Sequence, residues 1–444
     1  MAAATGARVV TIDPCHTCQP LGAAYLLLGI RGAVPLVHGS QGCCSYVRYL
    51  LNRHFREPVK VAATSFHEDA AVFGGRRNLV EGIKNLLLCY SPRFIGVVST
   101  CLSETIGDNI DSIIREVQKE LNGKINVSSK QVKIVPIHTP SYAGSHIKGY
   151  DNASRAVLEY LVQPGKDSNG KLNVIPGIIN PGDIEEIKHI LVEMDVPFLV
   201  LYDISRTLDT PLEISMSRLP KEGTSVKELA DAANSLGTIA LCRHAGGAGA
   251  RYLQKKFNIP ALLGPLPVGI ANTDRFLDSV KKLIGKEIPS SLEWERGILL
   301  DAMADSCQYT MMKRAALVGD PDIVAGTTRF ICELGMEPAV VMSSTASDEF
   351  VREVEVIARE YDYNPVVISG GDLYDFESAL KERRADIILS PSHGVEIARK
   401  VKVPVVRLGF PVYDRVGYHR RAIVGYRGSL SLLDLIVNSL LEFS

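Results

Sequence analysis

The sequence predicts an α/β protein of three doubly wound domains, each a mainly parallel sheet flanked by helices. Short apolar runs rich in β-branched residues alternate with amphipathic helical stretches along most of the chain, which is typical of parallel sheets covered on both faces. A chain of 444 residues also exceeds one hydrophobic core. About three domains of roughly 150 residues are therefore expected.

Candidate strands and helices follow one another in each third of the chain. The pattern predicts strands within 33–39, 93–100 and 132–139, within 173–178, 198–204 and 237–244, and within 314–320, 337–344, 364–369, 385–390 and 403–410. Apolar residues three and four apart predict helices within 108–123, 183–194, 291–314, 348–361 and 376–384.

Two positions divide the chain into domains. Pro164, Gly165 and Gly170 lie in a polar stretch that predicts a solvated loop. A new strand, turn and helix begin after the long helix within 291–314. We expect domains at 1–165, 166–312 and 313–444.

The composition excludes several classes of partner. A formal net charge of -1 leaves no basic field for nucleic acid and no polybasic membrane anchor. The apolar runs are too short to cross a bilayer, and the first residues lack the apolar core of a signal peptide. We expect a cytoplasmic protein without a nucleic-acid or membrane partner, in which nine cysteines ligate metal or are buried.

The stretch 38–58 holds the first candidate site. Gly39 and Gly42 are expected to adopt positive φ and bring the backbone close to a bulky ligand, while Cys43 and Cys44 supply soft sulfur ligands. Adjacent side chains diverge, so we expect one of these thiols to face the ligand and the other to be buried.

Three predicted strands end near thiol or hydroxyl groups. Cys43, Cys101 and Ser141 follow the strands within 33–39, 93–100 and 132–139, and ligands of open α/β sheets bind at the carboxyl ends of strands. Soft ligands on separate strand ends favour an iron–sulfur cluster over a compact zinc site. Cys15 and Cys18 form a CxxC pair, but no second pair or His pair accompanies it.

Other motifs have an ordinary structural explanation beside a functional one. Phe73 is either part of a short helix or a docking residue, and Asp301 and Asp305 either bind a cation or lie on a solvated helix face. The glycine-rich turns at 244–252 and 319–322 match no complete nucleotide-binding motif.

Six longer motifs occur in order: HGSQGC, NRHFREP, EDAAVFGG, TCLSETIGD, HTPSYAGSH and LGFPVYDR. With them, residues 12–440 resemble the β-subunit of the nitrogenase molybdenum–iron protein. The resemblance implies an α2β2 heterotetramer with a homologous α-subunit. It also implies an iron–sulfur P-cluster shared between the two subunits, through which electrons pass from an ATP-dependent iron protein to a catalytic iron–sulfur cofactor in the α-subunit, where dinitrogen is reduced to ammonia.

The same resemblance assigns roles to individual residues. Cys18, Cys43 and Cys101 would ligate the P-cluster, Ser141 would ligate its oxidised form, and Tyr46 would pack near it, whereas Cys15 would not be a ligand. Phe73 would lie where the iron protein docks. The ligands of a mononuclear iron or calcium ion between two β chains would be the Arg56 carbonyl, Glu57, and Asp301 and Asp305 of the other β chain.

The sequence also departs from the family. A longer N-terminal arm and C-terminal tail look absent, and SPSHGVEIA replaces a stretch that usually holds asparagine, tyrosine, glycine and lysine. Nitrogenase-like reductases of other substrates, such as methylthio-alkanes, share the architecture and remain an alternative. A cofactor-assembly scaffold and a metal-free nucleotide-binding protein are further alternatives.

Overall fold

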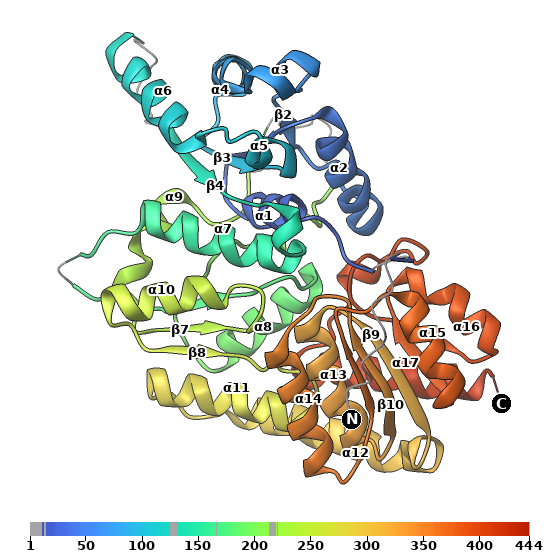
Figure 1. The fold of residues 1–444 in the computed structure, drawn as a ribbon. Coiled ribbons are helices and arrows are strands. Elements are labelled where there is room, and N and C mark those ends of the chain that lie inside the picture. The colour runs from blue at the N-terminus through green and yellow to red at the C-terminus, as the bar shows by residue number, and fades with distance from the viewer. Residues whose placement is uncertain are drawn as a thin grey trace. The chain divides into compact units, whose positions relative to one another are not determined.

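The computed structural model describes residues 11–12, 15–124, 132–165, 167–212, 219 and 221–443. In this part of the chain three all-parallel sheets are flanked by helices, which confirms the predicted fold class (Figure 1). The chain divides into two compact units. One comprises Cys18–Pro181 and Pro197–Leu263, and the other comprises the described parts of Met1–Thr17, Gly182–Val196 and Gly264–Ser444.

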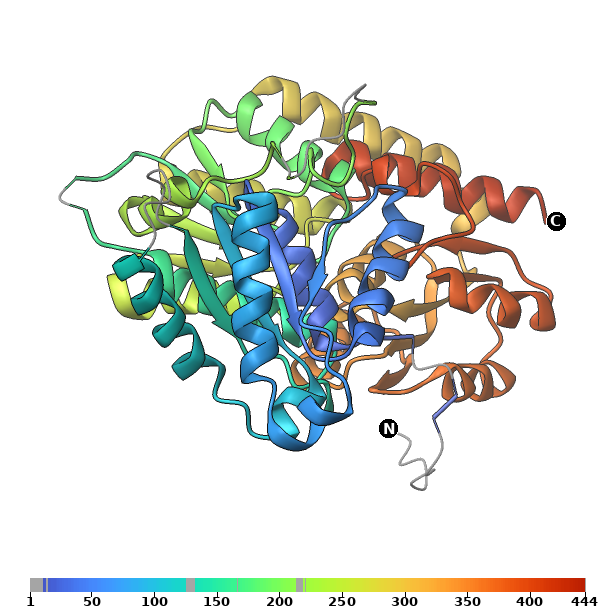
Figure 2. The same ribbon diagram turned by 90° about the horizontal axis from the view of Figure 1, so that it is seen from above.

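The first sheet has the order β2-β1-β3-β4. Its strands are β1 (Ala33–His38), β2 (Ala62–Ala63), β3 (Phe94–Ser99) and β4 (Lys133–Ile137). Helices α4 (Arg76–Tyr90) and α6 (Ile110–Lys124) cover one face of this sheet (Figure 2). Their apolar side chains pack against those of its strands. Helix α1 (Gln19–Leu28) lies against the other face, where Leu27 fills the space beside Gly96. Every residue of α1 is buried, as expected for a helix that is apolar on all sides.

A helix or helical turn follows each strand of this sheet. They are α2 (Gln41–Phe55) after β1, α3 (Glu68–Phe73) after β2, α5 (Cys101–Thr105) after β3, and the 3-10 turn η1 (Ser141–Ala143) followed by α7 (His146–Leu161) after β4. Backbone of α1 and α7 approaches closely at two glycines. A Cβ on Gly22 would lie 1.8 Å from the carbonyl oxygen of His146, and one on Gly149 would lie 1.9 Å from that of Gln19.

The second sheet has the order β6-β5-β7-β8. Its strands are β5 (Leu172–Ile175), β6 (Phe198–Val200), β7 (Gly237–Ala240) and β8 (Ala261–Leu263), with helices α8 (Pro181–Glu193), α9 (Val226–Ala230) and α10 (Gly247–Phe257) and the turn η2 (Asp231–Asn234) between them. At the glycine-rich turn before α10, the carboxylate of Asp151 accepts the backbone N–H of Ala248 at 2.7 Å.

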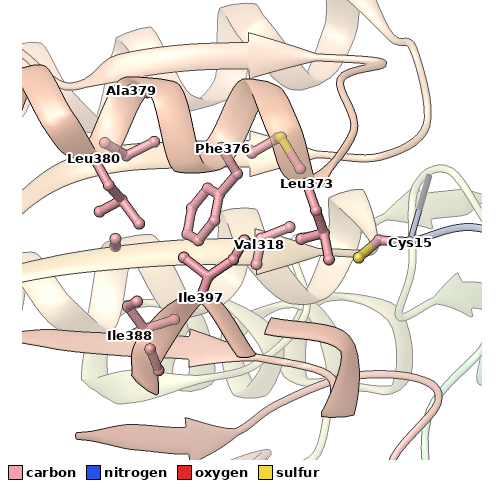
Figure 3. Packing of buried hydrophobic residues seen from close by; sticks show 12 residues of the cluster. Cys15, Val318, Leu373, Phe376, Ala379, Leu380, Ile388 and Ile397 are labelled. Carbon is pink, nitrogen blue, oxygen red and sulfur yellow. The ribbon is translucent and has the colours of Figure 1, made fainter. Parts of the chain in front are cut away.

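The third sheet has the order β11-β10-β9-β12-β13. Its strands are β9 (Arg314–Gly319), β10 (Glu337–Ser343), β11 (Val366–Ser369), β12 (Ile387–Ser390) and β13 (Val405–Arg407). The remaining elements are α11 (Gly269–Ile284), α12 (Ser290–Thr310), α13 (Pro321–Glu333), α14 (Asp348–Glu360), α15 (Leu373–Glu382), α16 (Val395–Val401), α17 (Gly425–Leu441), η3 (Ser392–Gly394) and η4 (Tyr418–Arg420). Phe376 and Ile397 pack over Val318 in its core, and Cys15 joins the edge of this cluster (Figure 3).

All eleven predicted strands are present, but two short strands were not predicted. β2 has two residues and β8 has three, and neither contains a β-branched or aromatic residue that would indicate a strand. Each of the three sheets falls within one of the segments 1–165, 166–312 and 313–444, so we retain these boundaries as a proposal. Within the described residues, no helix combines the length and the apolar character needed to cross a membrane.

Candidate functional site

Three neighbouring strands deliver candidate ligands to one edge of the first sheet. Cys43 lies in the first turn of α2 after β1, Cys101 is the first residue of α5 after β3, and Ser141 is the first residue of η1 after β4. Because β1, β3 and β4 are adjacent and parallel, their carboxyl ends meet at this edge. The juxtaposition of these strand ends was predictable from the sequence.

Cys18 reaches the same edge from the start of α1. It is the N-cap residue of α1 and forms an antiparallel backbone bridge with Ser145, just beyond η1. The next residue, Gln19, donates its backbone N–H to the Ser141 hydroxyl at 3.2 Å. The CxxC spacing carried no information about this arrangement, because Cys15 is buried in the core of the third sheet.

A buried amide holds these two segments together. The side chain of Gln19 is 1% exposed, donates to the Pro140 carbonyl at 2.6 Å and accepts from Asn152 Nδ2 at 3.1 Å. Sequence reasoning missed both Gln19 and Asn152. The only available signal was a polar residue directly after Cys18 at the start of an apolar helix.

The four groups interact electrostatically. The surrounding protein removes water from the Cys18 thiol and raises its pKa, although the residue as a whole is exposed. A hydrogen bond with Ser141 lowers that pKa, and the charges of Cys101 and Cys43 raise it. Negative charge on Cys43 and Cys101 therefore disfavours the thiolate of Cys18, and a bound cation would relieve this repulsion.

The donor set does not fit a single metal ion. Among the described residues, Cys18, Cys43 and Cys101 do not form a group whose sulfur atoms all lie within 4.8 Å of one another. Three thiols and a hydroxyl spread over one sheet edge instead suit a polynuclear group of soft metal and sulfide. Cys18 and Cys101 are exposed and Cys43 is half-buried, so this edge is open to a further ligand-bearing surface.

The two adjacent cysteines separate as predicted. Cys44 is buried and its thiol donates to the Val61 carbonyl at 3.4 Å, whereas the Cys43 sulfur accepts the Ser40 hydroxyl at 3.6 Å. The prediction of positive φ at Gly39 and Gly42 is wrong. Helix α2 begins at Gln41 and already includes Gly42, and Gly39 is needed because a Cβ there would lie 2.4 Å from the Thr100 hydroxyl.

His38 links this edge to the turn that carries Phe73. Its buried ring pairs with Thr64 Oγ1 at 3.2 Å and Asp108 Oδ2 at 3.1 Å, and burial lowers its pKa while Asp108 opposes that effect. Asp108 also accepts the backbone N–H of Gly75 at 2.9 Å. Phe73 ends α3 with 88% of its surface exposed. Sequence reasoning did not identify Asp108 as the connecting residue.

A second histidine lies at the end of β4. His138 pairs with Glu104 at 2.8 Å and with Asp111 at 2.9 Å. Partial burial of the ring lowers its pKa, but these two carboxylates outweigh that effect and raise it overall. The ion pairs tie the end of β4, which precedes Ser141, to α5, the helix of Cys101, and to α6. No sequence pattern indicated them.

The remaining predicted residues lie on the surface. Tyr46 is 41% exposed on α2, and Arg56 caps that helix with φ 61°. The Glu57 carboxylate accepts the Thr210 backbone N–H at 3.0 Å and its hydroxyl at 3.2 Å. Asp301 and Asp305 are exposed one turn apart on α12, in the other compact unit.

Comparisons with known proteins agree with one another. The family model described as nitrogenase component 1 type oxidoreductase matches residues 18–441. A nitrogenase molybdenum-iron protein beta chain from Methanococcus maripaludis is 46% identical, and the alignment covers 98% of this chain and 95% of that protein. A nitrogenase vanadium-iron protein beta chain from Trichormus variabilis is 41% identical, with 98% and 94% covered.

A solved structure shows the same fold. One chain of nitrogenase Cp1 at pH 6.5 superposes with a TM-score of 0.95 and 38% sequence identity, and covers 99% of this chain and 95% of its own length.

Proposed function

Since the chain belongs to the nitrogenase component 1 oxidoreductases and resembles their beta chains, we propose that it relays electrons from an ATP-dependent iron protein to a catalytic iron–sulfur cofactor in a homologous α-subunit, for the reduction of dinitrogen to ammonia. The observation that carries this proposal is the meeting of Cys18, Cys43, Cys101 and Ser141 at one sheet edge. Their chemistry and their spread fit half of a cluster that is shared with the α-subunit.

The residues of this chain bind and tune the cluster. A P-cluster bound there would supply one-electron transfer at a potential set by its ligands and surroundings. Cys18, Cys43 and Cys101 would hold it as thiolates, and Ser141 would add a hard oxygen ligand to its oxidised form. Gln19 holds Ser141 in place through its backbone N–H. The α-subunit completes the ligand set, in an α2β2 heterotetramer.

We assign the surface around Phe73 to docking of the iron protein. Phe73 and Val72 are 88% and 74% exposed at the end of α3. These apolar side chains are therefore not packed within this chain and form an exposed apolar patch. The Asp108 carboxylate accepts the backbone N–H of Gly75 and pairs with the His38 ring, which connects this turn to the end of β1.

We further propose that Glu57 and the Arg56 carbonyl bind an iron or calcium ion together with Asp301 and Asp305 of a second β chain. The two aspartates present exposed carboxylates on one face of α12, which are hard oxygen ligands. In the single chain, Thr210 provides the hydrogen bonds that Glu57 would exchange for the ion.

The test is anaerobic copurification with the homologous α-subunit, followed by assays of iron, acid-labile sulfide and ATP-dependent reduction. Ammonia from dinitrogen would support the proposal. Thiol and hydrocarbon from a methylthio-alkane without ammonia would replace it with a nitrogenase-like reductase. A cluster that leaves with a carrier protein would indicate an assembly scaffold, and a complex without iron would refute all three.

A further inference from the structure

Three potential metal ligands meet between α8 and α12, within one compact unit and apart from the cysteine site. Glu186 and His189 are three residues apart on α8, a spacing that places both on one helix face, and Glu295 comes from α12. One ligand atom from each of the three lies within 4.8 Å of the other two. Nothing in the sequence analysis indicated this cluster.

The carboxylates of Glu186 and Glu295 each have a buried oxygen atom without a hydrogen-bond partner. The Glu186 side chain is only 7% exposed, and its Oε1 is buried without a hydrogen-bond partner. Glu295 Oε2 is buried without one as well, while its Oε1 lies 2.9 Å from His189 Nε2. A buried carboxylate oxygen that lacks a partner is costly, so such atoms mark the place of a cation or a proton.

The surrounding charges favour a cation. Arg427 lies at the edge of the cluster, where its Nη1 is 3.7 Å from Glu186 Oε2 and its side chain is 55% exposed. It does not reach the two unpartnered oxygens. Asp183 adds a further negative charge close to Glu186. Three carboxylates thus surround the site with one guanidinium at its edge.

We propose that Glu186, His189 and Glu295 bind one divalent transition-metal ion of the zinc class. One imidazole nitrogen and two carboxylate oxygens form a donor set that suits zinc, manganese or ferrous ions, whereas calcium and magnesium prefer oxygen alone. His189 is 29% exposed, which leaves a route from solvent and room for water as a fourth ligand.

The ion would have a structural role, because it would cross-link two segments of the chain. Residues Gly182–Val196 belong to a different compact unit from the residues before and after them. A metal bond from Glu186 and His189 to Glu295 would fasten this segment to the long helix α12, because each ligand restricts the freedom of its own element.

The test measures zinc bound to the cluster-loaded αβ complex. After equilibrium dialysis against buffered Zn²⁺, the wild type is expected to hold one zinc more per β chain than the variants H189Q and E295Q. The matched control is E293Q, because Glu293 is an exposed carboxylate on the same helix, and it should bind as the wild type does. Equal zinc content in all four proteins would overturn the proposal and leave a shared proton as the explanation.

Two further measurements test the site even if H189Q and E295Q do not assemble into the αβ complex. Zn²⁺ should raise the Tm of the wild type and of E293Q, because a ligand that binds the folded state stabilises it. Zinc-edge anomalous diffraction from wild-type crystals soaked in Zn²⁺ should show a peak between the three side chains. The absence of that peak at saturating Zn²⁺ would contradict the site regardless of how the variants behave.

Discussion

The cysteines of the candidate site differ from the buried cysteines in where the backbone places them. Cys15, Cys44 and Cys332 are buried, and burial raises the pKa of the Cys332 thiol to about 12, so it remains a neutral apolar group. Cys18 and Cys101 instead begin helices at a strand edge and are exposed. To bind a cluster that is shared with another subunit, a thiol must be reactive and must also lie at the exposed edge of the sheet.

The cluster proposal predicts a selective effect of cysteine removal. C101A in the αβ complex should lower iron and acid-labile sulfide and abolish ATP-dependent reduction, because one ligand on this side of the cluster is lost. C89A is the matched control, since Cys89 is an exposed cysteine of α4 away from any strand end, and should retain its iron. Equal iron in the two complexes would exclude Cys101 as a ligand.

The docking surface predicts a different phenotype. F73A should reduce electron transfer from the iron protein by roughly tenfold or more if Phe73 is an interface hot spot, while the iron content of the complex stays unchanged. L88A removes an apolar side chain that is 81% exposed on α4 and should leave the rate unaffected. A rate that is equal for both variants, measured over a range of iron-protein concentrations, would place the docking surface elsewhere.

At this scale the sequence predicted residue types better than local geometry. Cys43, Cys101 and Ser141 were identified because each follows a predicted strand, whereas Cys18 was assigned only through the family resemblance. Positive φ was predicted wrongly for Gly39 and Gly42. A glycine near the start of a helix can be required either for positive φ or for close packing, and the sequence does not distinguish the two. Gln19 and Asp108 could not be identified, since their partners lie 121 and 70 residues away along the chain.

Among the elements, the crossing of α1 and α7 determines how well Cys18 is positioned. Cys18 precedes α1 directly, and Ser145, its bridge partner, caps α7 through its hydroxyl. Gly22 and Gly149 allow the two helices to touch through backbone atoms. Small residues at such a crossing let the helix axes approach more closely than ordinary side chains permit.

G22A tests this crossing. Its new methyl group would overlap the His146 carbonyl at 1.8 Å, so the helices must separate and unfolding should become easier by about 1–3 kcal/mol. The displaced Cys18 should also lower iron loading. In contrast, G297A on α12 meets no atom within 4 Å and should stabilise the chain by roughly 0.5–1 kcal/mol through helix propensity. Denaturant unfolding checks both signs, and equal stability of the two variants would show that the crossing tolerates a Cβ.

Strands were more predictable than their termini and partners. Buried parallel strands are continuous apolar runs, so β9, β10 and β12 were evident from local sequence. The sheet order, in which β12 lies beside β9 rather than β11, depends on contacts between residues more than 70 positions apart and has no local signal. The contact between α8 and α12 was not predicted for the same reason, because the two helices are far apart in the sequence.

At the scale of the whole molecule, acid stability depends partly on the stretch SPSHGVEIA, which runs from the end of β12 into α16. Ser392, within SPSHGVEIA, donates its hydroxyl to Asp414, and Arg407 donates to the same carboxylate at 3.0 Å. Burial raises the pKa of Asp414, but Arg407 and Ser392 outweigh it and lower the pKa to about 2. Ser392 therefore helps to anchor the loop that follows β13.

The sign of the pH effect follows from that lowered pKa. Asp414 stabilises the fold above its unfolded pKa of about 3.9, by at most about 2 kcal/mol, and this contribution disappears as the pH falls to about 2. D414N should therefore lower the denaturant midpoint at pH 7 and weaken its dependence on pH between about 4 and 2. D434N changes an exposed aspartate of α17 and should follow the wild type. A D414N curve parallel to the wild type would contradict the prediction.

The interleaved units of this chain have a consequence for its synthesis. Residues Gly182–Val196 pack with elements that begin only at Gly264, and the unit of the first two sheets is interrupted by them. A ribosome therefore exposes α8 well before α12 and α17 exist, so this helix waits with apolar residues such as Ile187 and Ile190 uncovered. The nascent chain cannot complete its units one after the other, and α8 is the segment we expect chaperones to protect during translation.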